Sequence, residues 1–304
     1  MNATNYLEIF GMTDKGCVRP ANEDCFLVQV MDTPQPRMNA SSIIEVRNRA
    51  DFMLAVADGM GGAAAGEVAS ATALSAISDY LLLHRDALNK VEGEERVRLL
   101  EKGVHVANQA IFDKAKEMGI QKPMGATITA AYVTGDVAYI FQIGDSRAYI
   151  MRAGNLYRIT RDQSFVGHLV EMGTITEAQA HRHPQRNVIL QALGTQENLK
   201  VDISYITLCK GDLLFLCSDG LYSEIEPENL LEVTESLCDN GIRGIISGLI
   251  ERAKELGGRD NITVLGLIVH EGMPLREPGE DPAYQPFPFL SKENPLEKSD
   301  SLFQ

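Results

Sequence analysis

Between Thr127 and Thr160 the sequence runs through four short apolar stretches, TITAAYV, VAYIFQI, AYIMR and NLYRIT. The breaks between them fall at 134–136, 144–146 and 153–155, and each break contains a glycine. Glycine permits the positive φ that tight hairpin turns require. The pattern therefore predicts an antiparallel meander, which commits this part of the chain to a sheet.

Further strands and several helices are indicated on either side of this meander. We expect strands at 6–12, 25–30, 52–57, 201–208, 212–217 and 262–269. We expect longer helices at 66–83, 95–117, 227–238 and 242–256. A short helix should start where Thr176 and Gln179 form a capping box, and residues 31–50 are interpreted as a loop or a splayed hairpin. Many antiparallel strands with interspersed helices predict an α+β layered domain.

The charge balance of the chain excludes two classes of partner. The 304 residues include 28 Lys and Arg against 42 Asp and Glu, which gives a formal net charge of −14. An acidic chain without a basic block is a poor ligand for nucleic acid or for an anionic membrane. No uncharged apolar run approaches the roughly 18 residues of a membrane span, and no signal peptide is visible. We expect a cytoplasmic monomer that neither binds nucleic acid nor inserts into a membrane.

Several catalytic and metal-binding motifs are absent from the sequence. The five cysteines form no CxxC pair and the six histidines form no HExxH motif, so a structural zinc site is not expected. The cysteines are expected to be reduced thiols. No cysteine is followed six positions later by arginine, which excludes a cysteine-phosphatase loop. P-loop and G-x-S-x-G motifs are also missing.

The last 34 residues, 271–304, differ in composition from the rest of the chain. They contain six of the twelve prolines and seven acidic residues, and they show no periodicity. Such a segment buries too little apolar surface to order itself. We expect one domain over 1–270 followed by a mostly disordered tail. Docking of the tail's aromatic residues on the body or on a partner is the alternative.

Acidic residues recur at the ends of the apolar strands. Asp58 and Asp219 each end a strongly apolar run and precede a glycine. Asp260 opens another strand, Asp145 lies in a turn between two strands, and Glu23–Asp24 come directly before a strand. For any one of these, a turn-forming role is the simpler interpretation. Their repetition predicts several carboxylates gathered at one edge of a sheet.

A cluster of carboxylates repels itself and therefore needs a cation. Oxygen donors without His or Cys favour Mg²⁺ or Mn²⁺, and the carbonyl of Gly59 is a further candidate ligand because glycine lets the backbone approach closely. Two such ions about 3.5–4 Å apart, bridged by a carboxylate and a water, form a site for phosphoester hydrolysis. Arg19, four residues before Glu23, is the candidate phosphate ligand. Taken alone, an arginine in this position is more often a surface residue.

Eight sequence blocks, in order, resemble the metal-dependent protein phosphatases, that is, the type 2C serine/threonine phosphatases, and especially their bacterial branch. The blocks are TDKGCVRPANED (13–24), VADGMGGAAAGE (56–67), MGATITAA (124–131), IGDSRAY (143–149), ITRDQSF (159–165), HPQRNVILQALG (183–194), CSDGL (217–221) and RDNITV (259–264). Together they span nearly the whole body of the chain.

The resemblance implies a fold and a first set of metal ligands. The fold would be a four-layer α/β/β/α sandwich, in which two central antiparallel sheets are flanked by helices and the metals lie at one edge. Asp58 would bridge two tightly bound ions, and Asp219 and Asp260 would complete the protein ligands of the first. Asp145 and Asp219 would hold a third, weaker ion.

The resemblance also implies ligands of the second metal and a substrate-binding region. The carbonyl of Gly59 and the pair Glu23 and Asp24 would serve the second ion, partly through water. Arg19 matches the phosphate-binding arginine and is expected to act in catalysis together with Asp58. Residues 160–194 resemble the bacterial flap region near the substrate entrance.

Three positions depart from the pattern of the family. Met60 occupies the place of a histidine proposed as proton donor in many eukaryotic members, although bacterial members commonly have methionine there. Ala126 replaces a threonine, and Gln163 replaces a histidine common in the bacterial block. None of these removes a metal ligand. They leave the leaving-group acid unassigned, and a metal-bound water is the default for that role.

The function expected from these residues is hydrolysis of phospho-Ser and phospho-Thr esters on proteins, by in-line attack of a hydroxide that bridges two Mn²⁺ or Mg²⁺ ions. The partners would be phosphorylated proteins and a cognate Ser/Thr protein kinase. One alternative is a catalytically weak regulatory module of the same fold that binds a phosphoprotein; the full set of ligand acids counts against it. Another is a non-enzymatic domain with structural Ca²⁺, which is disfavoured because no DxDxDG-type loop is present.

Overall fold

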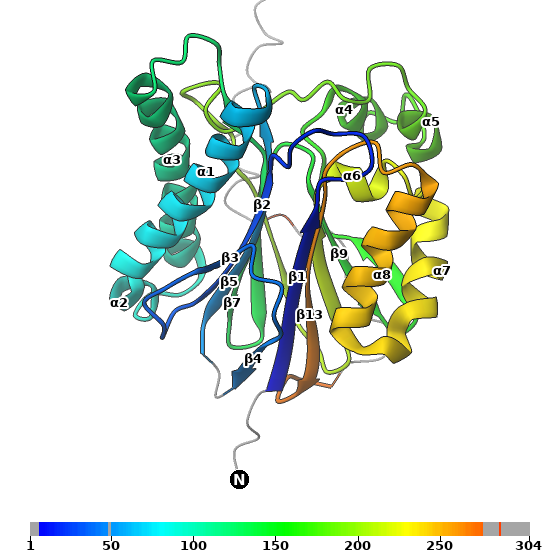
Figure 1. Cartoon of the computed structure of the whole chain (residues 1–304). Helices are drawn as coiled ribbons and strands as arrows, with labels where there is room; N and C mark the ends of the chain where they lie inside the picture. The colour runs from blue at the N-terminus through cyan, green and yellow to red at the C-terminus, as the bar shows by residue number, and fades with distance from the viewer. Residues whose placement is uncertain (1–5, 48–49, 276–285, 287–304) are drawn as a thin grey trace, which may run out of the picture.

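Two antiparallel sheets lie face to face in the structure, a computed structural model that describes residues 6–47, 50–275 and 286. Helices cover the outer side of each sheet, so the layers run α/β/β/α (Figure 1). This arrangement confirms the four-layer α+β sandwich that the resemblance implied. Within the described ranges, no helix combines the length and the apolar character needed to cross a membrane.

Strands distant in sequence lie side by side in both sheets. The first sheet has the order β10 (Asn155–Arg158), β9 (Arg147–Arg152), β12 (Leu213–Cys217), β13 (Ile262–Glu271), β1 (Tyr6–Asp14) and β4 (Ile44–Arg47). The second has the order β11 (Asp202–Thr207), β8 (Val137–Ile143), β7 (Ile128–Thr134), β5 (Phe52–Met60), β2 (Asp24–Val30) and β3 (Arg37–Met38). A short strand, β6 (Gly125–Ala126), pairs with β5.

The predicted meander is wrong at its middle connection. Strands β7 and β8 form a hairpin, as do β9 and β10, but β8 and β9 belong to different sheets. The break at Gly144 therefore carries the chain from one sheet to the other. Its φ of 96° resembles that of a hairpin glycine, so local sequence did not distinguish a turn from a crossover. Residues 31–50 are divided in the same way, because β3 joins one sheet and β4 the other.

Two pairs of long helices form the outer layers. Helices α1 (Ala63–Leu83) and α3 (Gly93–Glu117) cover the second sheet, whereas α7 (Pro227–Leu237) and α8 (Gly241–Leu256) cover the first (Figure 1). These helices and the six strands predicted outside the meander lie within three residues of their predicted bounds, whereas β6 was not predicted. The remaining helical segments are α2 (Arg85–Leu88), α4 (Phe165–Glu171), α5 (Glu177–His181), α6 (Asp219–Tyr222) and the 3₁₀ turn Cys238–Asn240.

The short helices are the elements that the spacing of apolar residues predicts least well. The capping box at the start of α5 is confirmed, since Thr176 accepts from the Gln179 N–H and Gln179 accepts from the Thr176 N–H. Helices α2, α4 and α6 were not predicted. With four to seven residues each, they are too short to repeat an apolar face.

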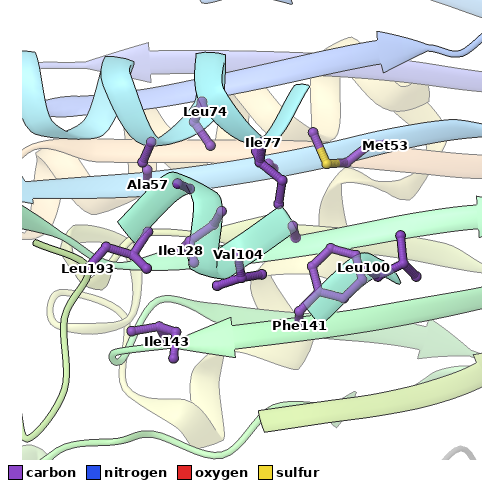
Figure 2. Close-up of a cluster of buried hydrophobic side chains, with 14 of the residues drawn as sticks. Met53, Ala57, Leu74, Ile77, Leu100, Val104, Ile128, Phe141, Ile143 and Leu193 are labelled. Atoms are coloured by element: carbon purple, nitrogen blue, oxygen red, sulfur yellow. The ribbon is translucent and has the colours of Figure 1, made fainter. Parts of the chain in front are cut away.

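Three buried apolar clusters hold the four layers together. Figure 2 shows the cluster under the first helix pair, which includes Leu74 and Ile77 of α1, Leu100 and Val104 of α3 and Phe141 of β8. A second cluster fills the space between the sheets. A third joins α7 and α8 to the outer face of the first sheet. Apolar side chains therefore cover much of both faces of each sheet. Against this background, polar side chains at the strand ends indicate candidate functional positions.

The body of the protein continues past residue 270. Strand β13 runs to Glu271, and Met273 is buried in the cluster between the sheets. The carbonyl of Pro274 accepts a hydrogen bond of 3.0 Å from the Lys210 N–H. Most of the predicted tail lies outside the described residues, so its disorder stays a prediction. Pro286 is described, and it forms an isolated antiparallel bridge with Ser204.

Candidate metal centre

Acidic side chains from both sheets converge at one end of the sandwich. Asp24 begins β2 and lies directly opposite Asp58 of β5 in the second sheet. Asp219 follows β12 and Asp260 precedes β13 in the first sheet, while Asp145 lies in the crossover between the sheets. Asp58 is close enough to the other four to experience their charge. The predicted cluster of carboxylates at a sheet edge is therefore present, and it draws on both sheets.

Burial and mutual repulsion disfavour the ionised forms of these acids. Burial is the main cause that raises the pKa of Asp24 to about 7, of Asp145 to about 8 and of Asp219 to about 6. Burial, followed by repulsion from Asp24 and Asp219, holds the pKa of Asp58 well above its usual range. The carboxyl groups of Asp58 and Asp219 are near enough to shift each other's pKa. Full ionisation of this cluster at neutral pH requires added positive charge.

Two carboxylate oxygens of the cluster lack a partner among the described residues. Oδ1 of Asp24 and Oδ1 of Asp219 are buried without a hydrogen bond, although a buried unsatisfied acceptor costs about 1–3 kcal/mol. The other oxygen of Asp24 is fixed by the hydroxyls of Ser218 at 2.6 Å and Thr263 at 2.7 Å. An all-oxygen donor set with unused lone pairs fits a hard divalent cation such as Mg²⁺ or Mn²⁺.

The carboxylates of this cluster are gathered but not yet arranged as ligands. Within residues 6–47, 50–275 and 286, no three His, Cys, Asp or Glu side chains form a ready-made metal-binding group. The raised pKa values and the unpaired oxygens of Asp24 and Asp219 favour a cation at this edge of the sandwich.

Glycine brings the backbone of β5 against the start of α1. A Cβ atom on Gly59 would overlap the carbonyl oxygen of Gly66, and one on Gly66 would overlap the Glu23 carboxylate. The carbonyl of Glu23 accepts from the Gly59 N–H at 3.2 Å and from Ser70 Oγ at 2.6 Å. Burial raises the pKa of Glu23 above its ordinary value, and the nearby Arg19 offsets part of this increase. The Glu23 carboxylate and the Gly59 backbone are therefore neighbours, as the metal assignment requires.

Arg19 lies at the rim of the cluster. It belongs to the loop between β1 and β2, and its Nη2 contacts Oδ2 of Asp260 at 2.6 Å. The Arg19 side chain is 49% exposed and that of Asp260 is 33% exposed, so solvent reaches both partners. The guanidinium is also near enough to lower the pKa of Asp219. The predicted phosphate-binding arginine thus lies beside the acids rather than on a remote surface.

Polar residues that orient this cluster were not identified from sequence. Asn261 Oδ1 accepts from the Glu23 N–H at 2.8 Å, and its Nδ2 donates to the carbonyls of Lys15 and Ala21 at 2.9 Å. Thr127 Oγ1 accepts from the Asp58 N–H at 3.0 Å. Only its position in the sequence could have indicated Asn261, because it follows Asp260 directly. Its function as a brace between distant loops is visible only in the fold.

A small cavity of about 40 Å³ separates the acids from the flap region, residues 160–194. Asp145 and Asp219 line one side, and residues of α4 and α5 line the other. In Figure 1, α4 and α5 lie at the same end of the sandwich as α6, whose first residue is Asp219. The flap region therefore lies beside two of the predicted ligands.

Arg147 connects this cavity to the start of the flap region. It is buried and forms an ion pair of 2.6 Å with Asp162, and its guanidinium lies 3.6 Å from the centroid of the Tyr222 ring. The Tyr222 hydroxyl donates to the carbonyl of Asp145 at 2.9 Å. One contiguous set of contacts thus runs from Asp145 to the flap. Arg147 was not singled out from sequence.

Gln163, one of the three departures from the family pattern, has a clear structural role. Its Oε1 accepts from the Gly144 N–H at 2.9 Å and its Nε2 donates to the Lys200 carbonyl at 3.0 Å. It therefore joins the crossover next to Asp145 to the segment that follows the flap region. Ala126 pairs with Gly59 in β6 and bridges Leu193. Neither residue displaces an acid of the cluster.

The chain belongs to the protein phosphatase 2C family. The sequence profile of that family matches residues 36–242, a range that includes Asp58, Asp145 and Asp219. The serine/threonine protein phosphatase PstP of Mycobacterium tuberculosis is 38% identical over 215 residues, which cover 70% of this chain and 39% of that protein. This chain therefore matches well under half of the length of PstP.

One further relative and one solved structure extend the comparison over most of the body. The serine/threonine phosphatase stp of Listeria welshimeri is 32% identical over 256 residues, 83% of this chain and 92% of that protein. Among solved structures, the catalytic domain of PstP in complex with two manganese ions superposes with a TM-score of 0.67 at 32% identity, covering 88% of this chain and all of that one. These likenesses confirm the predicted family and the predicted fold.

Proposed function

We propose that this chain is a metal-dependent protein phosphatase that hydrolyses phospho-Ser and phospho-Thr esters. The observation that carries the proposal is the convergence of five mutually repelling carboxylates at one edge of the sandwich, in a member of this family. The relatives described above are named serine/threonine phosphatases, and one of them has been solved with two manganese ions.

When bound, two Mn²⁺ or Mg²⁺ ions would activate water for in-line attack on the phosphorus atom. Asp58 lies directly opposite Asp24 in the second sheet and is close enough to Asp219 and Asp260 of the first sheet to experience their charge, so it is assigned to both ions. Asp219 and Asp260 are assigned to the first ion. Asp145 and Asp219, which line the same cavity, are assigned to a third and weaker ion.

The second ion is assigned to the donors around the start of α1. Glu23 and the Gly59 carbonyl are held together by the close approach of β5 to α1. Asp24 already accepts two hydroxyl hydrogen bonds through Oδ2, so only its unpaired Oδ1 is available, directly or through water. Asp24 is therefore expected to be a weaker ligand of the second ion than Glu23.

Arg19 is assigned to the phosphate of the substrate. In the structure its guanidinium is paired with Asp260. If Asp260 holds a metal ion, its carboxylate would be less available to Arg19, and the planar guanidinium could then bind two phosphate oxygens. The half-exposed position of Arg19 lets a phosphorylated side chain reach it from solvent. Phosphorylated proteins are thus the proposed substrates, and a Ser/Thr kinase that forms them is the proposed counterpart.

The test measures hydrolysis of an aryl phosphate and of a phosphoserine peptide by the full chain, with Mn²⁺ and with excess EDTA. We expect turnover of both substrates with Mn²⁺ and loss of both with EDTA. Calorimetry with Mn²⁺ counts the tight sites, and two are expected. Tight Mn²⁺ binding without turnover of either substrate would favour the regulatory-module alternative. Turnover that persists in EDTA would exclude the metal mechanism.

A further inference from the structure

Strand β11 lies at one end of the second sheet, and its outer edge is the site of an unusual contact. All six residues of β11 pair with β8 on one side. On its other side, Ser204 forms an antiparallel bridge with Pro286, a residue of the C-terminal segment that the composition predicted to be disordered. An open strand edge is a template for pairing with another strand.

We propose that residues 284–289, with the sequence YQPFPF, dock on this edge as an additional antiparallel strand. The occupant is the tail of the same chain. The proposal is independent of the metal chemistry at the other sites of the molecule.

The course of the chain fits this docking in reach and direction. The tail leaves the body beside the end of β11, because the Lys210 N–H donates to the Pro274 carbonyl. The twelve residues from Pro274 to Pro286 span up to roughly 40 Å when extended, whereas the six residues from Ser204 to Lys210 span roughly 20 Å. A tail that starts near Lys210 and runs back toward Ser204 is antiparallel to β11, as the bridge requires.

The register places the tail's aromatic residues beside apolar positions of β11. Directly opposite residues of antiparallel strands share a face, so the pair Ser204 and Pro286 sets Phe287 opposite Ile203 and Tyr284 opposite Ile206. Ile203 is fully buried in the cluster under α1 and α3. Ile206 belongs to the cluster between the sheets. In this register the residues of YQPFPF alternate between the two clusters, so the docked tail extends each cluster by one strand.

The prolines occupy the positions where a missing N–H is tolerated. Ser204 stands opposite Ile140 of β8, and further along the same register the Leu208 N–H donates to the Asp136 carbonyl. The alternation of an antiparallel ladder therefore makes Ser204 and Ile140 a hydrogen-bonded pair, so at Ser204 the tail forms a non-hydrogen-bonded pair. The backbone of Pro286 then points away from β11, and so does that of Pro288 two residues later. Proline is accepted on the outer side of an edge strand, where it also blocks further strand addition. The Pro-Phe-Pro spacing therefore fits a terminal strand.

Amide hydrogen exchange tests the docking in three chains: the full chain, a chain ending at residue 291 and a chain ending at residue 281. The N–H groups of Ile203 and Tyr205 point toward the tail in this register. We expect their exchange to be alike in the first two chains and at least about tenfold faster in the third. Amides of β13 provide the internal control and should not change.

A point substitution keeps the test decisive if the shortest chain folds poorly. Phe287→Asp in the full chain should reproduce the faster exchange, whereas the matched change Phe303→Asp should not. Equal exchange at Ile203 and Tyr205 in all chains would overturn the proposal. Protection that disappears on dilution, together with a dimer in sedimentation, would also overturn it, because the docked tail would then belong to a second copy.

Discussion

Asp24 and Asp58 lie directly opposite each other on the paired strands β2 and β5. Like charges in this relationship repel each other. Here burial adds to the repulsion, and the pKa of both carboxyl groups is raised as a result. Opposed apolar residues would make a more stable strand pair. The sequence instead places two acids where the sandwich ends, an arrangement that the proposed cation would stabilise.

Replacing Asp58 with Asn should separate stability from activity. Folding of the metal-free protein must either protonate Asp58 or bury its charge beside four neighbouring acids. The amide avoids both costs, so the metal-free protein should gain roughly 1 kcal/mol, or about 2–4 °C in Tm. The same change removes the donor assigned to both ions, so turnover should fall by about 10³-fold or more. Thermal unfolding in EDTA and hydrolysis with Mn²⁺ measure the two effects. A variant that is less stable and fully active would contradict the assignment.

The metal-free protein should lose stability as the pH rises from 6 to 8.5. Asp24, Asp145 and Asp219 have pKa values of about 7, 8 and 6 in the folded protein, above the ordinary value of about 3.9. In this range the folded state therefore binds more protons than the unfolded state, so the free energy of unfolding falls as pH increases. The expected loss is at least about 2 kcal/mol.

Mn²⁺ should reverse this dependence on pH. Binding favours the ionised carboxylates and displaces their protons, so stabilisation by Mn²⁺ should be larger at pH 8 than at pH 6. Thermal unfolding at four pH values, in EDTA and in Mn²⁺, measures both slopes. Asp58→Asn, with one acid fewer, provides a control whose slope in EDTA should be shallower. A flat profile in EDTA would show that the acids are not coupled to folding.

Arg19→Ala should impair substrate use and leave metal binding intact. Loss of one charge-assisted contact to phosphate should cost about 1.5–3 kcal/mol, or about 10- to 150-fold in kcat/KM on a phosphopeptide. Its ion pair with Asp260 is half exposed, and such pairs contribute at most about 1 kcal/mol to stability. Arg98→Ala, which removes an exposed pair with Glu94 of the same 2.6 Å length, is the matched control. Wild-type rates in Arg19→Ala would remove arginine from the mechanism.

Much of the fold was predictable because each strand carries its own signal. Runs such as Leu213–Cys217 are buried on both faces and are recognisable without their partners. The crossover at Gly144 was not predictable, because its positive φ serves a hairpin equally well. The residues of the site divide in the same way, into those that local sequence indicates and those that only the fold brings together. Asp58 was marked by the apolar run before it, whereas the contact of Arg19 with Asp260 joins positions 241 apart in the chain and exists only after folding.

Asp145→Asn tests the residue for which a turn-forming role is the strongest alternative. Asp145 lies in the turn between β8 and β9, where aspartate is common, and its carbonyl accepts a hydrogen bond from the Tyr222 hydroxyl. Asn keeps the turn preference and the backbone contact, so the fold and the two tight Mn²⁺ sites should be retained. If Asp145 helps Asp219 to hold a third ion whose water protonates the leaving serine oxygen, turnover of a phosphopeptide should fall by about 10²-fold or more. The loss on an aryl phosphate should be smaller, because that leaving group needs less protonation. Both substrates are measured over a Mn²⁺ titration, and equal rates for the variant and the wild type throughout would leave Asp145 as a turn former.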